Sequence, residues 1–191
     1  LDDALGECYV WNNLAALFVN SGLFGEALAC AVQCLRIADR NNLSNLEVRR
    51  RAENNIVLAK HRLGDHSGAL ATARRLISGA QDPRTAYEAT SRINLEQHFI
   101  LALIAQGELG EARKHVAFAQ KLLTRFPAPR QQIIISTASG LSEVLSGSPQ
   151  LGLKILEDAA LVAQKQLPAV FPEALSALAK AYEEVGDFER A

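Results

Sequence analysis

The chain has 191 residues, of which 49% are hydrophobic and 21% are charged, and its formal net charge at pH 7 is −1. This composition is typical of a folded globular protein and excludes a disordered chain. No apolar run reaches the ~18–20 residues that a membrane span needs. The near-neutral charge and the 6% of aromatic residues disfavour nucleic-acid binding.

Three cysteines, Cys8, Cys30 and Cys34, form no C-x-x-C pair. An odd count without that spacing predicts neither a disulfide framework nor a zinc site, and it favours a reducing, cytoplasmic location. The sequence starts at Leu1 without Met and stops at Ala191 inside an unfinished helical pattern. We therefore expect a fragment of a larger protein.

A repeat runs through the whole chain. It is marked by five glycines, Gly22, Gly64, Gly107, Gly147 and Gly186, whose successive spacings are 42, 43, 40 and 39 residues. A period of about forty residues is typical of arrays of helical hairpins. The spacing predicts a single repeat domain over 1–191 with units at about 5–41, 45–80, 83–126, 130–167 and an incomplete 170–191.

The first and last units carry the clearest pattern. Trp11, Leu14, Ala15 and Phe18 precede Gly22, and Leu175, Leu178, Ala179 and Tyr182 precede Gly186. Spacings of i, i+3, i+4 and i+7 indicate an amphipathic helix, and the glycine that follows predicts a left-handed helix end. Extended to every unit, the pattern predicts an all-α chain of nine helices at about 5–21, 24–40, 45–63, 66–79, 83–106, 109–125, 130–146, 149–166 and 170–185.

Local signals place several helix boundaries. Ser44-x-x-Glu47 is a capping box, and Asp82-Pro83 and Ser148-Pro149 each put a capping side chain before a proline of the first helical turn. The isoleucine-rich run Gln132–Ser136 could form a strand, but the repeat register assigns it to a buried helix. Gly152 occupies a position where other units have alanine.

These landmarks resemble the tetratricopeptide repeat (TPR) family, whose pattern is W-x-x-L-G-x-x-Y, A-x-x-x-F, P. The resemblance covers essentially the whole chain, although the period is longer than the usual ~34 residues and the closing proline is missing. Longer-period versions occur in kinesin light chain, in bacterial peptide-pheromone receptors and in bacterial transcription activators. The resemblance implies a right-handed superhelix (α-solenoid) whose first helices line a concave groove for a peptide or a partner helix.

Polar side chains that precede the core pair of each first helix are the candidate binding residues. In the family, such residues often hold the backbone of a bound peptide, and an amide can donate and accept at once. We expect Asn13 and Asn55 to be exposed. The alternative, that these residues only solvate a face or bond to neighbouring helices, stays open for the first two units and is favoured for Thr137 and Ser176. The candidates are Asn12, Asn13, Asn54, Asn55, Gln97 and His98.

Charge is distributed unevenly along the chain. Residues 1–31 sum to −4, residues 47–75 to +4 and residues 172–191 to −3. The basic segment could receive an acidic peptide, a terminal carboxylate or a nucleotide phosphate, whereas the alternative is a solvated face. Its candidate site residues are Arg51, Lys60, His61 and Arg62.

No pattern supports catalysis. The four histidines show no ligand spacing, no nucleophile elbow or phosphate loop is present, and the repeat register places Cys34 in the core. We therefore predict no enzyme, no metal and no cofactor. The leading hypothesis is a protein- or peptide-binding sensor or docking module of a larger, bacterial, signalling or transcription-regulating protein. The alternative is an oligomerisation spacer that forms a homodimer without a peptide ligand.

The end of the last unit yields one further expectation. Because the second helix of this unit is missing from the sequence, we expect Leu178, Tyr182 and Phe188 to be undercovered.

Overall fold

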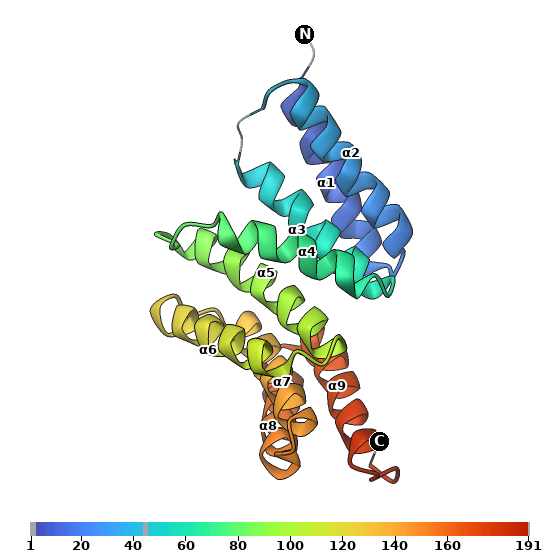
Figure 1. The fold of residues 1–191 in the computed structure, drawn as a ribbon, viewed down its shortest axis with the longest axis vertical. Helices are drawn as coiled ribbons and strands as arrows, with labels where there is room; N and C mark the ends of the chain where they lie inside the picture. Colours follow the sequence, from blue (N-terminus) through green and yellow to red (C-terminus); the bar gives the residue numbers. More distant parts are fainter. Residues whose placement is uncertain (1–2, 44–45, 191) are drawn as a thin grey trace. The chain divides into compact units, whose positions relative to one another are not determined.

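A computed structural model describes residues 3–43 and 46–190, with only the backbone of Leu46 included. Within these ranges the chain forms nine α-helices and one short 3₁₀ helix, and it forms no strand (Figure 1). The elements are α1 (Ala4–Asn20), α2 (Phe24–Arg40), α3 (Leu46–Arg62), α4 (His66–Ser78), α5 (Ala86–Ala105), α6 (Leu109–Arg125), α7 (Pro129–Leu145), α8 (Pro149–Gln166), η1 (Pro168–Val170) and α9 (Phe171–Glu184).

The predicted all-α class and helix order are confirmed, but two predicted caps are wrong. Helix α5 begins at Ala86 and not at Pro83, because the Thr85 hydroxyl accepts from the Glu88 amide while Glu88 accepts from the Arg84 amide. At Ser148, Pro149 does begin α8, but the serine side chain makes no capping hydrogen bond. The predicted Ser44 capping box lies outside the described residues.

Each of the five landmark glycines ends a first helix in the same way. All five have positive φ, between 74° and 86°, which glycine adopts without steric cost. After Gly22, for example, the Leu23 amide donates to the Phe18 carbonyl at 2.9 Å, and the Gly22 amide donates to the Val19 carbonyl at 3.1 Å. This pair of bonds is a Schellman motif, which satisfies carbonyls at the helix end and turns the chain into the next helix.

The helices group into two compact units, residues 1–81 and residues 82–191. In unit 1, α1 packs against α2, and α3 packs against both of them and against α4. Small and β-branched side chains fill its core because the helices approach closely. The core residues are Cys8, Ala15, Cys30, Ala31, Cys34, Ile37, Ala38, Val48, Ala52 and Ile56.

In unit 2, α7 is the central helix. It packs against α5, α6, α8 and α9. Two clusters surround it: Ile133, Ile134, Ala159, Ala160, Ala163, Val170 and Ala174 form one, and Leu141, Val144, Leu156 and Ala181 form the other. The predicted assignment of 132–136 to a buried helix is therefore confirmed.

Helices α7 and α8 meet at two glycines. A Cβ atom added at Gly152 would lie 2.6 Å from the Gly140 carbonyl oxygen, and one added at Gly140 would lie 2.9 Å from the Gly152 carbonyl oxygen. Both distances are shorter than a Cβ atom tolerates. The glycine that replaces alanine in this repeat thus lets the two backbones touch.

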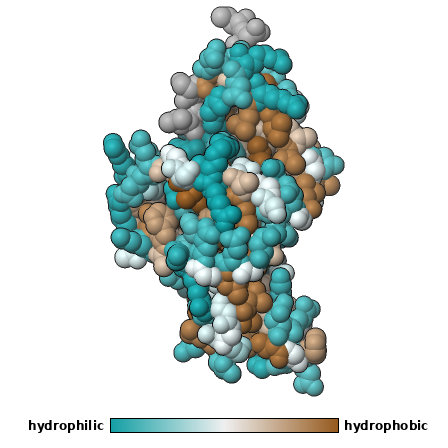
Figure 2. Space-filling view, in the orientation of Figure 1, coloured by the Kyte–Doolittle hydropathy of each residue, from teal (hydrophilic) through white to brown (hydrophobic). Residues whose placement is uncertain are grey.

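The visible surface is mainly hydrophilic, with hydrophobic residues between hydrophilic ones over α1 and α2 (Figure 2). None of the described helices is both long and apolar enough to cross a membrane.

The expected undercovered end of the last unit is confirmed only for Phe188, which is 76% exposed. Tyr182 is only 5% exposed, because its ring is buried and its hydroxyl donates to Glu157 Oε1, and Leu178 is half-buried against two core clusters.

Candidate interaction surface

The first helices of successive hairpins lie side by side within each unit. Helix α1 contacts α3 in unit 1, and α7 contacts both α5 and α9 in unit 2. The candidate amide residues stand at matching places on these helices: Asn12 on α1, Asn54 on α3 and Gln97 on α5 each precede their glycine landmark by ten residues. The repeat therefore places an amide at the same position on the neighbouring helices α1 and α3 of unit 1 and again on α5 of unit 2.

Two candidate asparagines in unit 1 bond to each other. The Asn55 amide nitrogen donates to Asn12 Oδ1 at 3.1 Å, and Asn12 is buried. Asn13 is exposed, as expected, but Asn55 is half-buried. The expectation of an exposed Asn55 is therefore wrong: its amide group holds α3 to α1, so its removal would leave a buried oxygen unpaired.

Three other candidates share one face of α3. Arg51, Asn54 and His61 are spaced i, i+3 and i+10, which places them along a single stripe. All three are half-buried, and Arg51 pairs with Glu47 at 2.7 Å. This stripe, Arg51–Asn54–His61, offers a guanidinium, an amide and an imidazole and is called the α3 polar stripe below.

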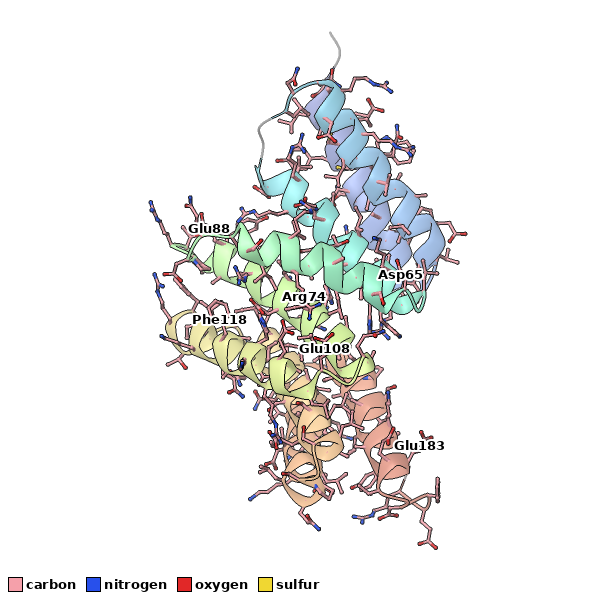
Figure 3. The ribbon with its side chains drawn as sticks, viewed as in Figure 1. Asp65, Arg74, Glu88, Glu108, Phe118 and Glu183 are labelled. Atoms are coloured by element: carbon pink, nitrogen blue, oxygen red, sulfur yellow. The ribbon has the colours of Figure 1, made fainter. Side chains whose placement is uncertain are left out.

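The end of the α3 polar stripe adjoins the turn into α4. The Nδ1 atoms of His61 and His66 lie 3.2 Å apart with their rings tilted, so His66 packs against the end of α3. Lys60 Nζ reaches Thr72 Oγ1 at 3.4 Å. Asp65, labelled in Figure 3, caps α4 by accepting from the Gly68 amide at 2.9 Å. These contacts hold the α3–α4 turn closed.

Acidic neighbours reduce the charge of the basic segment. Besides the Arg51–Glu47 pair, Arg75 pairs with Glu53 at 3.2 Å, and Arg49 pairs with Asp39 at 2.7 Å. Arg62 is exposed and its guanidinium carbon lies 6.0 Å from the centre of the Phe24 ring. An acidic ligand would therefore compete with carboxylates already in place, which limits what the arginines can contribute to its binding.

In unit 2 the candidates bond within the unit. Gln97 is buried and its amide nitrogen donates to Glu173 Oε1 on α9 at 3.1 Å. His98 is half-buried beside it on α5. Thr137, where a solvating or helix-bonding role was favoured, is buried and donates to the Ile133 carbonyl in its own helix.

A buried ionic cluster between α5 and α6 escaped the sequence analysis. The Glu96 carboxylate is fully buried, accepts from Arg92 Nε at 2.7 Å and lies 2.6 Å from His115 Nδ1. Because an ionised carboxylate can only accept, His115 donates through Nδ1. His115 also packs edge-on against Phe99, and Arg92 lies over the ring of Phe118, labelled in Figure 3.

The spacing of Arg92 and Glu96, one helical turn apart, was the one sequence signal of this cluster. Nothing in the sequence marked His115 as its third member, since it comes from a different helix. Every charge in the cluster faces a partner of opposite sign or an aromatic ring. The arrangement supports packing of α5 against α6.

The cysteines confirm the predicted core role of Cys34. All three are buried and free, and Cys8 Sγ donates to the Cys34 carbonyl at 3.4 Å. Burial raises the pKa of the Cys34 thiol to about 12, and it also raises the pKa of Cys8 and Cys30. These thiols are therefore poor nucleophiles at neutral pH.

The described residues contain no group of three or more His, Cys, Asp or Glu side chains placed to hold a metal ion. The imidazole pair His61–His66 supplies two nitrogens only.

No protein-family model matches the sequence, and no curated protein matches it. Solved structures do. Two crystal structures of kinesin light chain TPR-like repeats from Podosopora anserina are similar over nearly the whole chain. One has a TM-score of 0.67 at 18% identity and covers 95% of this chain and 87% of its own; the other has a TM-score of 0.68 at 17% identity and covers 99% and 91%.

This similarity defines the class of fold. The chain is a TPR-like array of antiparallel helical hairpins, as the resemblance of the sequence implied. The long-period relatives named from the sequence include kinesin light chain, and both neighbours are of that kind. At this identity the neighbours establish the fold and leave the ligand to be argued from the residues of this chain.

Proposed function

We propose that the chain is a non-enzymatic, cytoplasmic protein- or peptide-binding module that serves as sensor or docking segment of a larger bacterial signalling or transcription-regulating protein. The observation that carries the binding role is the α3 polar stripe. A guanidinium, an amide and an imidazole lie along one first helix, next to the helix that carries Asn12. The TPR-like fold supports the same role, since such repeats form protein-interaction scaffolds.

Within this proposal the candidate residues have different roles. Asn54 pairs with the backbone of an extended ligand, and Arg51, Lys60, His61 and Arg62 favour an acidic side chain or a terminal carboxylate. Asn12 and Asn55 hold α1 and α3 in place for it. Gln97 and His98 are proposed only as contacts of a ligand within unit 2, and no metal or cofactor takes part.

Binding is tested by fluorescence anisotropy with a library of labelled peptides, each made with a carboxylate or an amide at its C-terminus. Asn54→Ala should weaken binding by about 1–3 kcal/mol, because a ligand backbone group loses its partner. Arg51→Gln and Arg62→Gln should weaken binding most at low salt, because exposed charges are screened as salt rises.

Arg36→Gln is the matched control, since Arg36 is an exposed arginine of unit 1 on the second helix α2. It should leave the affinity for every peptide unchanged. An affinity that ignores the α3 substitutions but falls with changes on α2 or α4 would contradict this site and move it to the second helices.

Exposed apolar side chains favour one alternative, an oligomerisation spacer. Helix α8 exposes Leu151, Leu161 and Val162, and such residues can join two copies. Sedimentation at several concentrations, with and without peptides, separates the two functions. A dimer that binds no peptide of the library would support the spacer.

A further inference from the structure

Helix α6 has a face that none of the described helices of unit 2 covers. Within this unit, α6 packs against α5 and α7 only. Gly110, Ala117 and Thr124 of α6 are exposed. They recur every seven positions, which places them in one row along the helix. We call this row, Gly110–Ala117–Thr124, the α6 seam.

The α6 seam consists of small residues. A Cβ atom added at Gly110 would have nothing within 4 Å, so the space above this residue is open. The Thr124 hydroxyl donates to the Gln120 carbonyl of the same helix at 3.1 Å and therefore needs no other partner. Because the separation of two packed helices depends on the side chains at their contact, a row of small residues lets another helix approach closely.

Basic side chains border the α6 seam. The stretch between Glu111 and Glu143 is the longest part of the sequence without an acidic residue, and its lysines and arginines sum to +5. Lys114 and Lys121 are exposed and seven positions apart, so they form a stripe parallel to the seam. Neither lysine forms an ion pair with a described residue, and both charges are therefore available to a partner.

Two arginines of α6 already have partners. Arg113, towards the start of the helix, pairs with Glu143 at 2.7 Å, and Arg125, at its end, pairs with Asp82 at 2.7 Å. The free positive charge of α6 is therefore that of the two lysines, and a carboxylate lies near either end of the helix.

Spacing and charge select an acidic helix as the partner. Lys114 and Lys121 are separated by about 10.5 Å along α6, at 1.5 Å per residue, and two carboxylates seven positions apart on a second helix have the same separation. A helix lying along the α6 seam can thus place one carboxylate beside each lysine, in the way that charged residues flank the contact of a coiled coil.

Two other anionic partners fit this face less well. A nucleic acid carries closely spaced phosphates, which the carboxylates of Asp82 and Glu143 would repel at both ends of the helix. A helix that binds a lipid surface buries large apolar side chains in it. None of the exposed large apolar side chains of the described residues lies on α6.

We propose that the α6 seam is a docking surface for an acidic helix of a partner protein, which is held by ion pairs with Lys114 and Lys121. The proposal is independent of the peptide ligand proposed above, because it concerns a second helix of unit 2 and uses no residue of the α3 polar stripe. Association through exposed ion pairs and small residues is weak and salt-sensitive, which suits reversible docking.

The test is fluorescence anisotropy of labelled peptides titrated with the full chain. The peptides are alanine-rich and about 25 residues long, so that they are helical in isolation. One has glutamates every seven positions along a single stripe, a second has the same composition with the glutamates distributed around the helix, and a third has glutamine in place of glutamate. We expect the striped peptide to bind more tightly than both of the others.

Substitutions on α6 locate the peptide. Lys114→Gln and Lys121→Gln should each weaken binding of the striped peptide by about two- to fivefold, the effect of losing one exposed ion pair, and the difference should shrink as salt rises. Lys121→Arg keeps the charge and should keep the affinity. Lys154→Gln is the matched control, since Lys154 is an exposed lysine of unit 2 on α8, and it should change nothing.

Ala117→Arg separates helix docking from simple attraction of charge. It adds a positive charge but places a large side chain in the α6 seam. A helix that must lie close to the seam should bind this variant more weakly, whereas a ligand held by charge alone would bind it more tightly. Circular dichroism of each variant checks that the fold is retained.

Several results would overturn the proposal. Absence of measurable binding, equal binding of the striped and distributed peptides, or tighter binding to Ala117→Arg would exclude docking of a helix on the seam. Affinity that ignores both lysine substitutions but falls with Asn54→Ala would place the peptide on the α3 polar stripe. A short DNA duplex or anionic lipid vesicles that bind more tightly than the striped peptide, and lose affinity in the same lysine variants, would assign the face to that class of partner.

Discussion

The side chain of Glu96 has a large predicted effect on stability. It is fully buried with Arg92 and His115 as its partners. Glu96→Ala should destabilise unit 2 by about 3–5 kcal/mol, because the arginine would keep its charge in a buried site without its partner. Urea unfolding followed by circular dichroism measures this loss.

Asp82→Ala is the control, because it breaks an exposed pair with Arg125 at a similar distance of 2.7 Å. Exposed pairs contribute about 0–1 kcal/mol, so the two variants should differ clearly. Equal losses for Glu96→Ala and Asp82→Ala would contradict the structural role of the cluster.

The Cys34 thiol should be nearly unreactive in the folded protein. With a pKa of about 12, roughly one thiol in 10⁴ is ionised at pH 8, and only the thiolate is alkylated. Between about pH 9 and 12 the unfolded thiol loses its proton while the folded thiol keeps it, so the free energy of unfolding should fall as pH rises. Iodoacetamide labelling with mass spectrometry, in native buffer and in urea, checks the reactivity; fast native labelling of Cys34 would contradict its burial.

At the level of helices, the contact between α7 and α8 depends on the absence of a side chain. Gly152→Ala should destabilise unit 2 by about 1–3 kcal/mol, because the new methyl group would meet the Gly140 carbonyl and the Val144 backbone. The same change at a helix position with free space around it would stabilise the protein, since alanine has a higher helix propensity than glycine.

Gly110→Ala provides that comparison. Gly110 lies in α6 with nothing within 4 Å of an added Cβ atom. Thermal unfolding of the two variants should move the Tm in opposite directions. A stabilising Gly152→Ala would mean that the two helices are not in backbone contact.

Most of the helices could be predicted because their signals are local. The glycine landmarks and the i, i+3, i+4, i+7 stripes placed every α-helix. The errors concern the start of two helices, where the side chain predicted to cap the helix does not do so. At α5 the sequence analysis used Asp82-Pro83, whereas in the structure Thr85 caps the helix by accepting from the Glu88 amide, and the Glu88 carboxylate accepts from the Arg84 amide.

The candidate site was less predictable because its contacts join distant residues. Asn12 and Asn55 are 43 positions apart, and Gln97 and Glu173 are 76 apart. The repeat pattern identified Asn12, Asn55 and Gln97 as polar positions of first helices, but it could not tell an amide that bonds to a neighbouring helix from one that faces a ligand. Cross-helix packing decides that difference.

For the molecule as a whole, each compact unit should fold by itself. Residues 1–81 and residues 82–191 each contain their own buried clusters. The two fragments, expressed separately, should each keep a helical circular dichroism spectrum and a cooperative thermal transition.

A fragment ending at Gly147 is the control, since it removes α8 and α9 from their packing against α7. It should lose cooperative unfolding. A fragment 82–191 without helical signal would contradict the independence of unit 2.

The five Schellman turns also show how few particular residues the turns of this architecture require. Their hydrogen bonds join backbone groups only, and each turn requires no more than a glycine in the left-handed region. Most other positions of a hairpin can then drift under the loose requirement of remaining apolar or polar. The same fold is therefore compatible with very different sequences, which fits the 17–18% identity between this chain and its solved neighbours.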